Sequence, residues 1–296
     1  MDLKRCMICP RNCGVNREKT LGFCKAGINI KIARYSLHYW EEPCISGEKG
    51  SGTIFFSCCN LKCLFCQNYD ISTNNNGKEI SIEKFSDICL KLQNMGANNI
   101  NLVTPTMYIP LIKDGLILAK KKGLNIPIVY NTSGYEKVES LKELDGLIDI
   151  YLPDCKYYDD ELAINFSNVS NYFNIFKDAL KEMYRQVGSP ILSNNLIKKG
   201  IIVRHLVLPK HSDDSKKILK YLYDTYKDNI YISIMNQYTP VRRIDKYKEL
   251  NNKLKENEYD KLIDYAINLG IVNAFVQEKD TCKESFIPDF SKFDEI

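Results

Sequence analysis

The sequence predicts an α/β protein, a partial (β/α)6 TIM-type barrel that carries an N-terminal cysteine-rich metal-binding extension. Three observations predict this fold class. Short β-rich runs alternate with longer amphipathic stretches from residue 50 onward, polar residues follow nearly every expected strand, and seven of the twelve cysteines fall in two tight groups. We expect residues 1–48 to form the cysteine-rich leader and residues 49–296 to form the barrel with a C-terminal strand and helix extension.

The composition is that of an ordinary globular protein. The 296-residue chain is 44% hydrophobic and 26% charged, and its formal net charge of +4 is too small to indicate a nucleic-acid or membrane partner. The sequence has no apolar signal region and no run of about eighteen apolar residues. We therefore expect a cytoplasmic protein. In that reducing compartment, clustered cysteines bind metals more often than they form disulfides.

Four cysteines mark the leader: Cys6, Cys9, Cys13 and Cys24. Their CxxC and CxxxC spacing, with a fourth thiol after a Gly-containing turn, suits a closed tetrahedral zinc site or a second iron–sulfur cluster. The spacing does not separate these two, and a set of unliganded thiols is the remaining alternative. The leader has few large apolar residues, which favours a metal centre that holds it together.

The rest of the chain alternates strand and helix patterns. Runs rich in Val, Ile, Phe, Tyr and Thr predict strands at residues 53–57, 99–103, 127–130, 147–152, 200–208, 230–235 and, more weakly, 271–275. Amphipathic stretches predict helices at residues 82–95, 108–122, 138–144, 172–187, 213–227 and 257–269. This order favours right-handed βαβ units and a parallel sheet. Residues 157–171 are expected to form either a lid or a solvated connection.

Functional side chains of such a barrel lie where strands end and the following loops begin. The sequence places polar, ionisable or turn-forming residues at nearly all of these points. In chain order they are Cys59/Cys63/Cys66, Thr104 to Tyr108, Asn131 to Tyr135, Asp154 to Lys156, Arg204 with His205, and Asn236 to Pro240. A purely structural barrel does not require this pattern, so these strand ends are expected to form a site.

Three cysteines directly after the first expected strand carry the strongest signal. Cys59, Cys63 and Cys66 have CxxxCxxC spacing on a polar loop. Three thiolates fix three irons of a four-iron cluster and leave the fourth iron open to an outside ligand. The alternative is a buried trio of cysteines, which the polar neighbours Asn60 and Lys62 disfavour. The five remaining cysteines are dispersed and are expected to be structural; they are Cys44, Cys58, Cys89, Cys155 and Cys282.

These cysteines, with Phe65 before the third, resemble the signature of the radical S-adenosylmethionine (SAM) superfamily. The segments Cys66 to Ser72, Gly50 to Ser57 and Asn131 to Tyr135 are similar to an uncharacterised branch related to pyruvate formate-lyase activating enzymes. The resemblance implies a [4Fe–4S] cluster whose open iron is chelated by SAM. It also implies reductive cleavage of SAM to a 5′-deoxyadenosyl radical, which abstracts a hydrogen atom from a substrate.

The resemblance places cosubstrate contacts at the second and third strand ends. Thr104 and Thr106 occupy the position of a glycine-rich loop that holds the methionine amino group, although glycine and glutamate are missing here. Asn131 and Ser133 are similar to ribose or carboxylate contacts; the alternative is that they form a helix N-cap turn before Tyr135.

Three further residues follow from the same resemblance. Asp154 and Lys156 look like a pair of cosubstrate contacts at the fourth strand end, with a structural ion pair as the alternative. Arg204 is expected to pair with the methionine carboxylate, because a guanidinium binds a carboxylate through two parallel hydrogen bonds. Since side chains alternate along a strand, His205 should face the opposite side of the sheet.

The sequence therefore predicts a radical SAM enzyme of the oxidoreductase type, with an activase of a glycyl-radical enzyme as one candidate. Radical modification of a small molecule or another protein is the second candidate, and a non-catalytic iron–sulfur or zinc protein is the third. The expected partners are SAM, an electron donor such as flavodoxin or ferredoxin, and, for an activase, a protein substrate.

Overall fold

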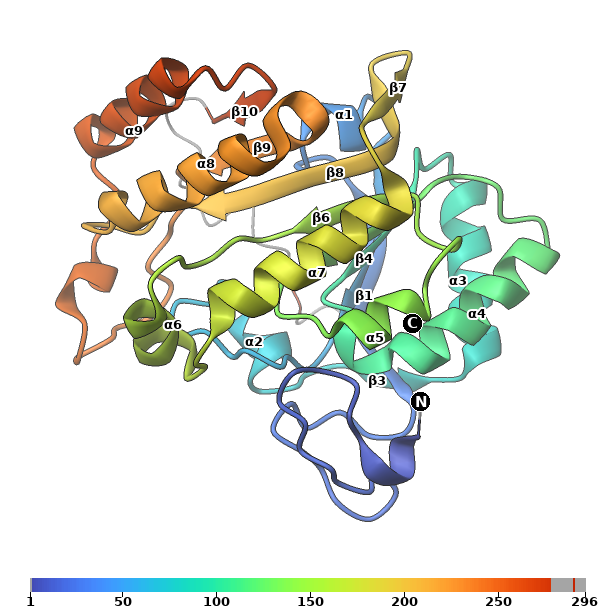
Figure 1. The fold of residues 1–296 in the computed structure, drawn as a ribbon. Coiled ribbons are helices and arrows are strands. Elements are labelled where there is room, and N and C mark those ends of the chain that lie inside the picture. The colour runs from blue at the N-terminus through green and yellow to red at the C-terminus, as the bar shows by residue number, and fades with distance from the viewer. Residues whose placement is uncertain (1, 278–289, 291–296) are drawn as a thin grey trace.

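A computed structural model describes residues 2–277 and Phe290 (Figure 1). Its centre is a ten-stranded sheet in which the strands pair in the order β10-β9-β8-β6-β5-β4-β2-β1-β3, with β7 beside β8. The strands are β1 (Ile30–His38), β2 (Ser51–Phe56), β3 (Lys78–Ile80), β4 (Ile100–Val103), β5 (Ile128–Thr132), β6 (Ile150–Pro153), β7 (Ile191–Ser193), β8 (Leu196–Leu206), β9 (Tyr231–Met235) and β10 (Ala274–Val276).

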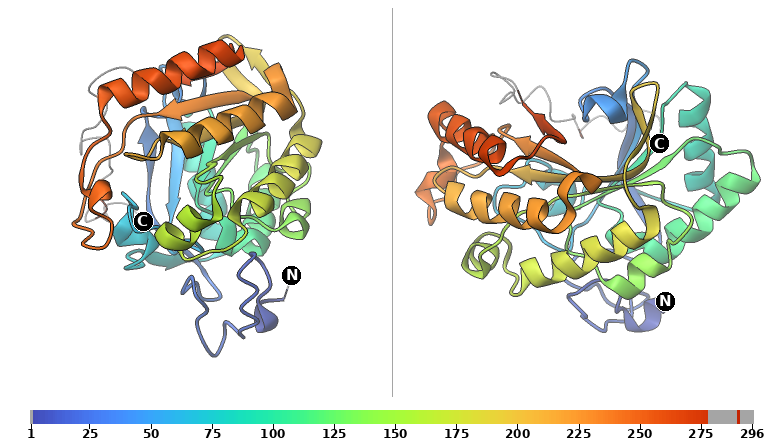
Figure 2. Two further views of the ribbon diagram at one scale, coloured as in Figure 1. Left: turned by 60° about the vertical axis from the view of Figure 1, so that its left-hand side comes forward. Right: turned by 45° about the horizontal axis from the view of Figure 1, so that its top comes forward.

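The expected parallel barrel is confirmed. Strands β2, β4, β5, β6, β8, β9 and β10 pair in parallel, and the curved sheet forms a partial barrel rather than a closed one (Figure 2). All seven predicted strands and all six predicted helices occur. The helices are α1 (Pro43–Ser46), α2 (Tyr69–Ser72), α3 (Ile82–Asn94), α4 (Ile109–Lys121), α5 (Val138–Lys142), α6 (Asp160–Ser167), α7 (Tyr172–Val187), α8 (Ser212–Tyr226) and α9 (Glu256–Leu269).

Alternation along the strands separates the inside of the barrel from its helix-covered outside. In β5 and β6, Val129, Ile150 and Leu152 belong to a small apolar cluster inside the barrel. Their neighbours Tyr130 and Tyr151 belong to the large core that the sheet shares with the outer helices. The next inward positions toward the strand ends are therefore directed into the space at the carboxyl end of the barrel.

The leader differs from the expected division at residue 48. Strand β1 lies within residues 1–48, yet it pairs antiparallel with β2, with Tyr35 opposite Ile54, and antiparallel with β3. The cysteine-bearing segment before Ile30 packs as a separate lobe below the barrel (Figure 1). The structure thus assigns residues 30–38 to the sheet and leaves the cysteine lobe as residues 2–29.

Residues 157–171, expected to be a lid or a connection, contain helix α6. Its C-terminal end reaches the cysteine loop, where the Leu64 amide donates to the Phe166 carbonyl at 2.8 Å. The segment is therefore part of the wall around that loop. In the described part of the chain, no helix is both long enough and apolar enough to cross a membrane.

Candidate active site

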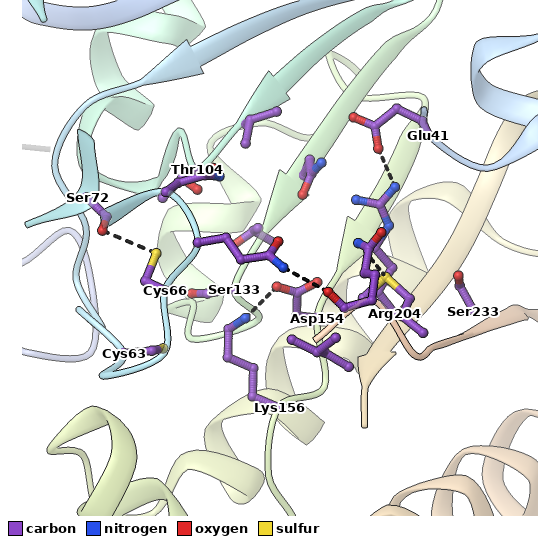
Figure 3. Close-up of a pocket in the computed structure, with 18 of the residues that line it drawn as sticks. Glu41, Cys63, Cys66, Ser72, Thr104, Ser133, Asp154, Lys156, Arg204 and Ser233 are labelled. Atoms are coloured by element: carbon purple, nitrogen blue, oxygen red, sulfur yellow. Dashed lines mark hydrogen bonds and ion pairs between the residues drawn. The ribbon is translucent and has the colours of Figure 1, made fainter. Parts of the chain in front are cut away.

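A cavity of about 420 Å³ lies at the carboxyl ends of the parallel strands. Cys59, Cys63 and Cys66 line it together with residues of β2, β4, β5, β8, β9 and β10 and with Asp154 and Lys156, which follow β6. Figure 3 shows Cys63 and Cys66 on one side, Arg204 and Glu41 on the other, and the Asp154–Lys156 pair between them. The sheet thus brings residues that are distant in sequence to one site, as the strand-end pattern predicts.

The cysteine loop, residues 58–66, is held from several directions. Its tight course places two non-glycine residues at positive φ, Cys58 at 77° and Lys62 at 56°. The Asn60 side chain is fully buried and donates to the Tyr135 carbonyl at 2.9 Å, which fastens the loop to the end of β5. This anchoring fixes the direction of the three thiols before any cluster binds.

Each of the three sulfurs accepts a hydrogen bond. The donors are the Leu61 amide to Cys59 Sγ at 3.4 Å, the Ser167 hydroxyl to Cys63 Sγ at 2.9 Å and the Ser72 hydroxyl to Cys66 Sγ at 3.3 Å. Hydrogen-bond donors directed at sulfur stabilise the thiolate over the thiol. The loop therefore has the surroundings that a set of thiolate ligands requires.

Burial makes the thiols of the cysteine loop costly to ionise, and a bound cation would offset this cost. Burial and the nearby Cys63 thiol raise the pKa of Cys59 to about 12, and burial also raises the pKa of Cys66. Bound iron offsets this cost, because its positive charge deprotonates a coordinating thiol. Three thiols directed at one cavity therefore fit the cysteine ligand set of a [4Fe–4S] cluster with one open iron.

Ser167 connects Cys63 to a second buried hydroxyl. The Tyr157 hydroxyl lies 2.6 Å from Ser167 Oγ, and both side chains are fully or almost fully buried. Because the one hydroxyl proton of Ser167 is directed to Cys63, Tyr157 acts as the donor to Ser167. The result is a chain of two hydrogen bonds that ends on a proposed cluster ligand.

We expect Ser167→Ala to shift the reduction potential of a cluster at this loop to a more negative value. A hydrogen bond to a ligand sulfur favours the reduced cluster, which carries more negative charge, and the substitution removes that bond. Redox titration of the anaerobically reconstituted protein, followed by electron paramagnetic resonance, measures the shift. Ser86→Ala is the matched control, because Ser86 is buried in α3 and its hydroxyl has no hydrogen-bond partner among residues 2–277 and Phe290. Equal potentials for the two variants would contradict the expectation.

Asp154 and Lys156 form an ion pair in the middle of the cavity wall. Lys156 Nζ lies 2.6 Å from Asp154 Oδ2, and 18% and 24% of the two side chains remain exposed. Burial alone would lower the pKa of Lys156, but the Asp154 carboxylate and the Cys63 thiol raise it above its ordinary value. The pair is thus both an ion pair and a set of charged groups that a ligand beside the cysteine loop would contact.

Three other predicted contacts, Thr104, Asn131 and Ser133, also line the cavity. Thr104 has φ of 59°, so a threonine adopts the left-handed backbone conformation that glycine favours at this strand end. The buried Ser133 hydroxyl has no hydrogen-bond partner within the described residues. Helix α5 begins only at Val138, after the N-cap Lys137, which leaves Asn131 and Ser133 without the alternative role of capping it.

Thr106 lies elsewhere. It is fully buried, does not line the cavity and donates to Glu136 Oε1 at 2.5 Å. Thr132 donates to the same oxygen, and burial raises the pKa of Glu136 to about 7. Thr106 thus contributes to a buried cluster of polar groups behind the strand ends and makes no direct contact with the cavity.

Arg204 faces the cavity, but two carboxylates hold its guanidinium. Arg204 Nε donates to Glu42 Oε1 at 2.8 Å, and Nη2 donates to Glu42 Oε2 and to Glu41. Burial opposes the charge of Arg204, yet Glu42 and Glu41 raise its pKa well above the ordinary value. Arg204 therefore connects β8 to the segment after β1, in an ion-pair triad opposite the cysteine loop.

His205 faces the other side of the sheet, as expected from alternation. Its Nδ1 lies 2.7 Å from the Cys155 carbonyl and its Nε2 lies 2.8 Å from the Ser215 hydroxyl of α8. Burial lowers its pKa to about 4, so the ring is neutral at pH 7. His205 is a packing residue between sheet and helix.

Comparison with known proteins assigns the family. A sequence model of the radical SAM superfamily matches residues 53–222, which include the cysteine loop and most of the barrel. This chain belongs to the radical SAM superfamily. Membership implies a [4Fe–4S] cluster and SAM, and both agree with the ligand set and the cavity.

Relatives of this radical SAM protein include proteins from an archaeon and a bacterium. It is 34% identical over 286 residues to the uncharacterized protein MJ0674 of Methanocaldococcus jannaschii, covering 91% of this chain and 77% of the relative. It is 24% identical over 167 residues to pyruvate formate-lyase 1-activating enzyme of Escherichia coli K12, covering 54% and 62% of the two chains. Its branch is thus similar in sequence to activating enzymes.

The fold is also found among solved radical SAM structures. Streptococcus suis SuiB bound to the precursor peptide SuiA has a TM-score of 0.53 and 14% identity, covering 75% of this chain and 47% of that one. The [FeFe]-hydrogenase maturase HydG has a TM-score of 0.51 and 15% identity, covering 77% and 52% of the two chains. At these identities the likeness concerns the fold alone, and this chain spans about half of each structure.

The radical SAM barrel is fastened to the leader by Arg11. Its guanidinium donates to the backbone carbonyls of Asn60 at 2.9 Å, Asn168 at 2.7 Å and Ser167 at 3.2 Å, and it stacks on Phe23 at 3.8 Å. One side chain of the leader therefore contacts both the cysteine loop and the end of α6.

The four leader cysteines lie in one lobe. Cys6, Cys9 and Cys24 are buried and Cys13 is exposed, while Arg17 donates to Cys6 Sγ at 3.2 Å. Burial raises the pKa of Cys9 to about 12, and the Cys24 and Cys6 thiols reinforce that shift. Across residues 2–277 and Phe290, no three His, Cys, Asp or Glu side chains converge closely enough to hold a single ion.

Sequence patterns did not identify several residues of this site. Glu41 and Ser167 carry no local motif, and only their contacts with Arg204 and Cys63 show their positions. Of the cysteines expected to be structural, Cys44, Cys89 and Cys155 are buried away from the cavity, whereas Cys58 is buried and lines it. Cys282 lies outside the described residues.

Proposed function

We propose that Cys59, Cys63 and Cys66 bind a [4Fe–4S] cluster, that SAM binds in the adjoining cavity, and that the protein is an enzyme that abstracts a hydrogen atom from its substrate. One observation carries the proposal. The three thiols, the Asp154–Lys156 pair and the unpartnered Ser133 hydroxyl line a single cavity of about 420 Å³. This volume lies within the usual range for small-ligand sites.

When bound, the cluster and SAM supply one-electron cleavage of SAM to methionine and a 5′-deoxyadenosyl radical. The side chains of this protein orient the cosubstrate. The Lys156 ammonium and the Asp154 carboxylate suit the carboxylate and amino groups of its methionine part, and Asn131 and Ser133 suit its ribose hydroxyls. Thr104, with its left-handed backbone conformation, lines the same cavity.

The far end of the cavity is assigned to the substrate. There Arg204 pairs with both Glu41 and Glu42, so its guanidinium holds the cavity wall in place and is not available to the methionine carboxylate. Phe55, Leu206 and Met235 supply apolar surface in the same wall. Such surface excludes water from a reactive radical.

The finer proposal is that the substrate is a glycyl-radical enzyme. The similarity of this chain to pyruvate formate-lyase 1-activating enzyme supports it. Such a partner would give up one hydrogen atom from a glycine Cα, and the products would be 5′-deoxyadenosine and a radical on the partner protein.

The leader is proposed to bind a second metal centre through Cys6, Cys9, Cys13 and Cys24. The spacing of four cysteines within one lobe of little apolar core supports it, and the thiols would have to draw together to hold a single ion, because no three of them converge within the described residues. A zinc ion and an iron–sulfur cluster both suit this ligand set. Metal analysis decides between them, as described in the Discussion.

The test of the proposed function uses anaerobically reconstituted protein with SAM and dithionite. We expect 5′-deoxyadenosine and methionine in equal amounts, and none without reductant. A protein that holds about four irons at the cysteine loop but forms no 5′-deoxyadenosine would refute the proposed reaction.

The activase proposal has its own measurement. A glycyl-radical enzyme of the same organism is labelled with α-deuterated glycine and added to the reaction. Transfer of deuterium into 5′-deoxyadenosine is expected. Formation of 5′-deoxyadenosine without deuterium would reject this substrate while leaving the SAM reaction intact.

A further inference from the structure

The positive charge of this protein is concentrated in its cysteine lobe. Residues 1–29 contain six Lys and Arg residues against two acidic residues, an excess of four that equals the formal net charge of +4 of the whole chain. The remaining residues are therefore balanced. A charge excess confined to one lobe creates a positive potential at that lobe, although the rest of the chain carries no net charge.

Two of the six cations attach the lobe to the barrel. Arg11 donates to the backbone of the cysteine loop and of α6, as described above. Arg17 is 5% exposed and donates to the Met107 carbonyl at 2.7 Å and to Cys6 Sγ. These contacts fix the lobe beside the loop that is proposed to hold the cluster.

The other four cations face solvent. Lys4, Arg5, Lys19 and Lys25 are exposed, and none of them pairs with a carboxylate in the described part of the chain. Lys62 of the cysteine loop extends this charge, with its Nζ 5.2 Å from the Phe23 ring centre.

Apolar side chains lie among these charges. Met7, Leu21 and Ile28 are 39%, 55% and 43% exposed, and all three belong to the same lobe. Exposed apolar residues surrounded by charge are typical of surfaces that bind another protein. The combination indicates a transient interface with a partner of opposite charge.

We propose that this surface docks a small acidic one-electron carrier protein and that the electron for the cluster enters here. The proposal rests on the proposed function, because only a redox cluster at the cysteine loop needs such a donor. The proposed function places the cosubstrate on the cavity side of the loop, which leaves the side of the lobe and Lys62 for the donor. One electron leaves the reduced carrier and reduces the cluster, and the carrier dissociates oxidised.

The test measures the rate of cluster reduction rather than catalytic turnover. Photoreduced acidic flavodoxin is mixed with the reconstituted protein in a stopped-flow instrument, and bleaching of the cluster absorbance gives the second-order rate constant. We expect Lys19→Glu/Lys25→Glu to lower this constant about tenfold at low salt, since oppositely charged surfaces speed association. High salt should slow the wild type and leave the variant almost unchanged.

Lys49→Glu/Lys121→Glu is the matched control. It changes the net charge by the same amount, and both residues are exposed at the opposite, amino-terminal ends of the strands. We expect this variant to be reduced by flavodoxin at the rate of the wild type. Reduction by dithionite should be equal in all three proteins.

Two results would overturn the docking site: equal slowing by both charge reversals, or equal rates for Lys19→Glu/Lys25→Glu and the wild type. Failure of the proposed function is a separate outcome. In that case dithionite reduces the cluster but SAM yields no 5′-deoxyadenosine, while the flavodoxin rates still report on the surface.

Discussion

Substitution of Cys59, Cys63 and Cys66 with alanine is expected to remove the cluster and reduce 5′-deoxyadenosine formation to background. The three thiols supply the protein ligands of one site, and alanine offers no ligand in their place. The broad visible absorbance of the reconstituted protein measures the cluster, and chromatography of the reaction mixture measures 5′-deoxyadenosine. The proposed leader site does not share these ligands, so a metal bound there should remain.

The same experiment identifies the metal of the leader. About eight irons in the wild type and about four in the triple variant would mean a second cluster at Cys6, Cys9, Cys13 and Cys24. About four irons with one zinc, falling to zinc alone in the variant, would mean a zinc site. Loss of every metal from the triple variant would contradict two independent sites.

Cys89→Ala is the control for this series. Cys89 is a fully buried cysteine of α3 outside the cavity, so it tests the cost of removing a packed thiol without removing a ligand. We expect a small loss of stability and an unchanged cluster. A cluster that persists in the triple variant, or one that is lost from Cys89→Ala, would reject the assignment of ligands.

The sequence predicts those parts of the fold and of the site whose pattern lies within a short stretch of the chain. Buried parallel strands are short apolar runs, and the outer helices repeat their apolar residues with helical spacing. The cysteine loop is local as well, since its three ligands lie within eight residues. These features depend on neighbours in the chain, so the strands, the helices and the ends of the strands could be placed in advance.

The contacts that complete the site have no local signal. Arg204 and Glu42 are 162 residues apart, Ser167 and Cys63 are 104 apart, and Arg11 and Asn168 are 157 apart. Such pairs form only when the folded sheet curves around the cavity and brings distant residues together. Strand β1 was missed for a related reason, because the predicted leader was defined by its cysteines and the strand pairs with β2 beyond them.

Arg204→Ala is expected to destabilise the protein by about 3–5 kcal/mol. The substitution leaves Glu41 and Glu42 buried, at 7% and 5% side-chain exposure, without the guanidinium that neutralises them. Denaturation by urea at pH 7.5, followed by circular dichroism on the reconstituted protein, gives the free energy of unfolding. Arg204→Lys should recover only part of the loss, since an ammonium cannot form the two parallel bonds to Glu42.

The pH dependence of this stability has a definite sign. Burial raises the pKa of Glu42, but Arg204 outweighs it and holds the pKa below the ordinary value of 4.5. The Glu42 contribution is therefore fully present above the pKa of the unfolded chain and is lost as the pH falls through the lower folded value. In Arg204→Ala the main influence that lowers the pKa of Glu42 is gone and burial still raises it, so acidification should reduce the difference in unfolding free energy between variant and wild type.

Rescue distinguishes lost charge balance from simple loss of packing. We expect Arg204→Met/Glu41→Gln/Glu42→Gln to regain most of the stability lost in Arg204→Ala, because replacing every member of a buried ionic group leaves no unpaired charge. Glu41→Gln/Glu42→Gln alone should remain destabilised, since it leaves the cation unpaired. If the triple variant is no more stable than Arg204→Ala, the triad does not act through charge neutralisation. Retention of SAM binding by the triple variant would further separate this wall of the cavity from the cosubstrate contacts at Asp154 and Lys156.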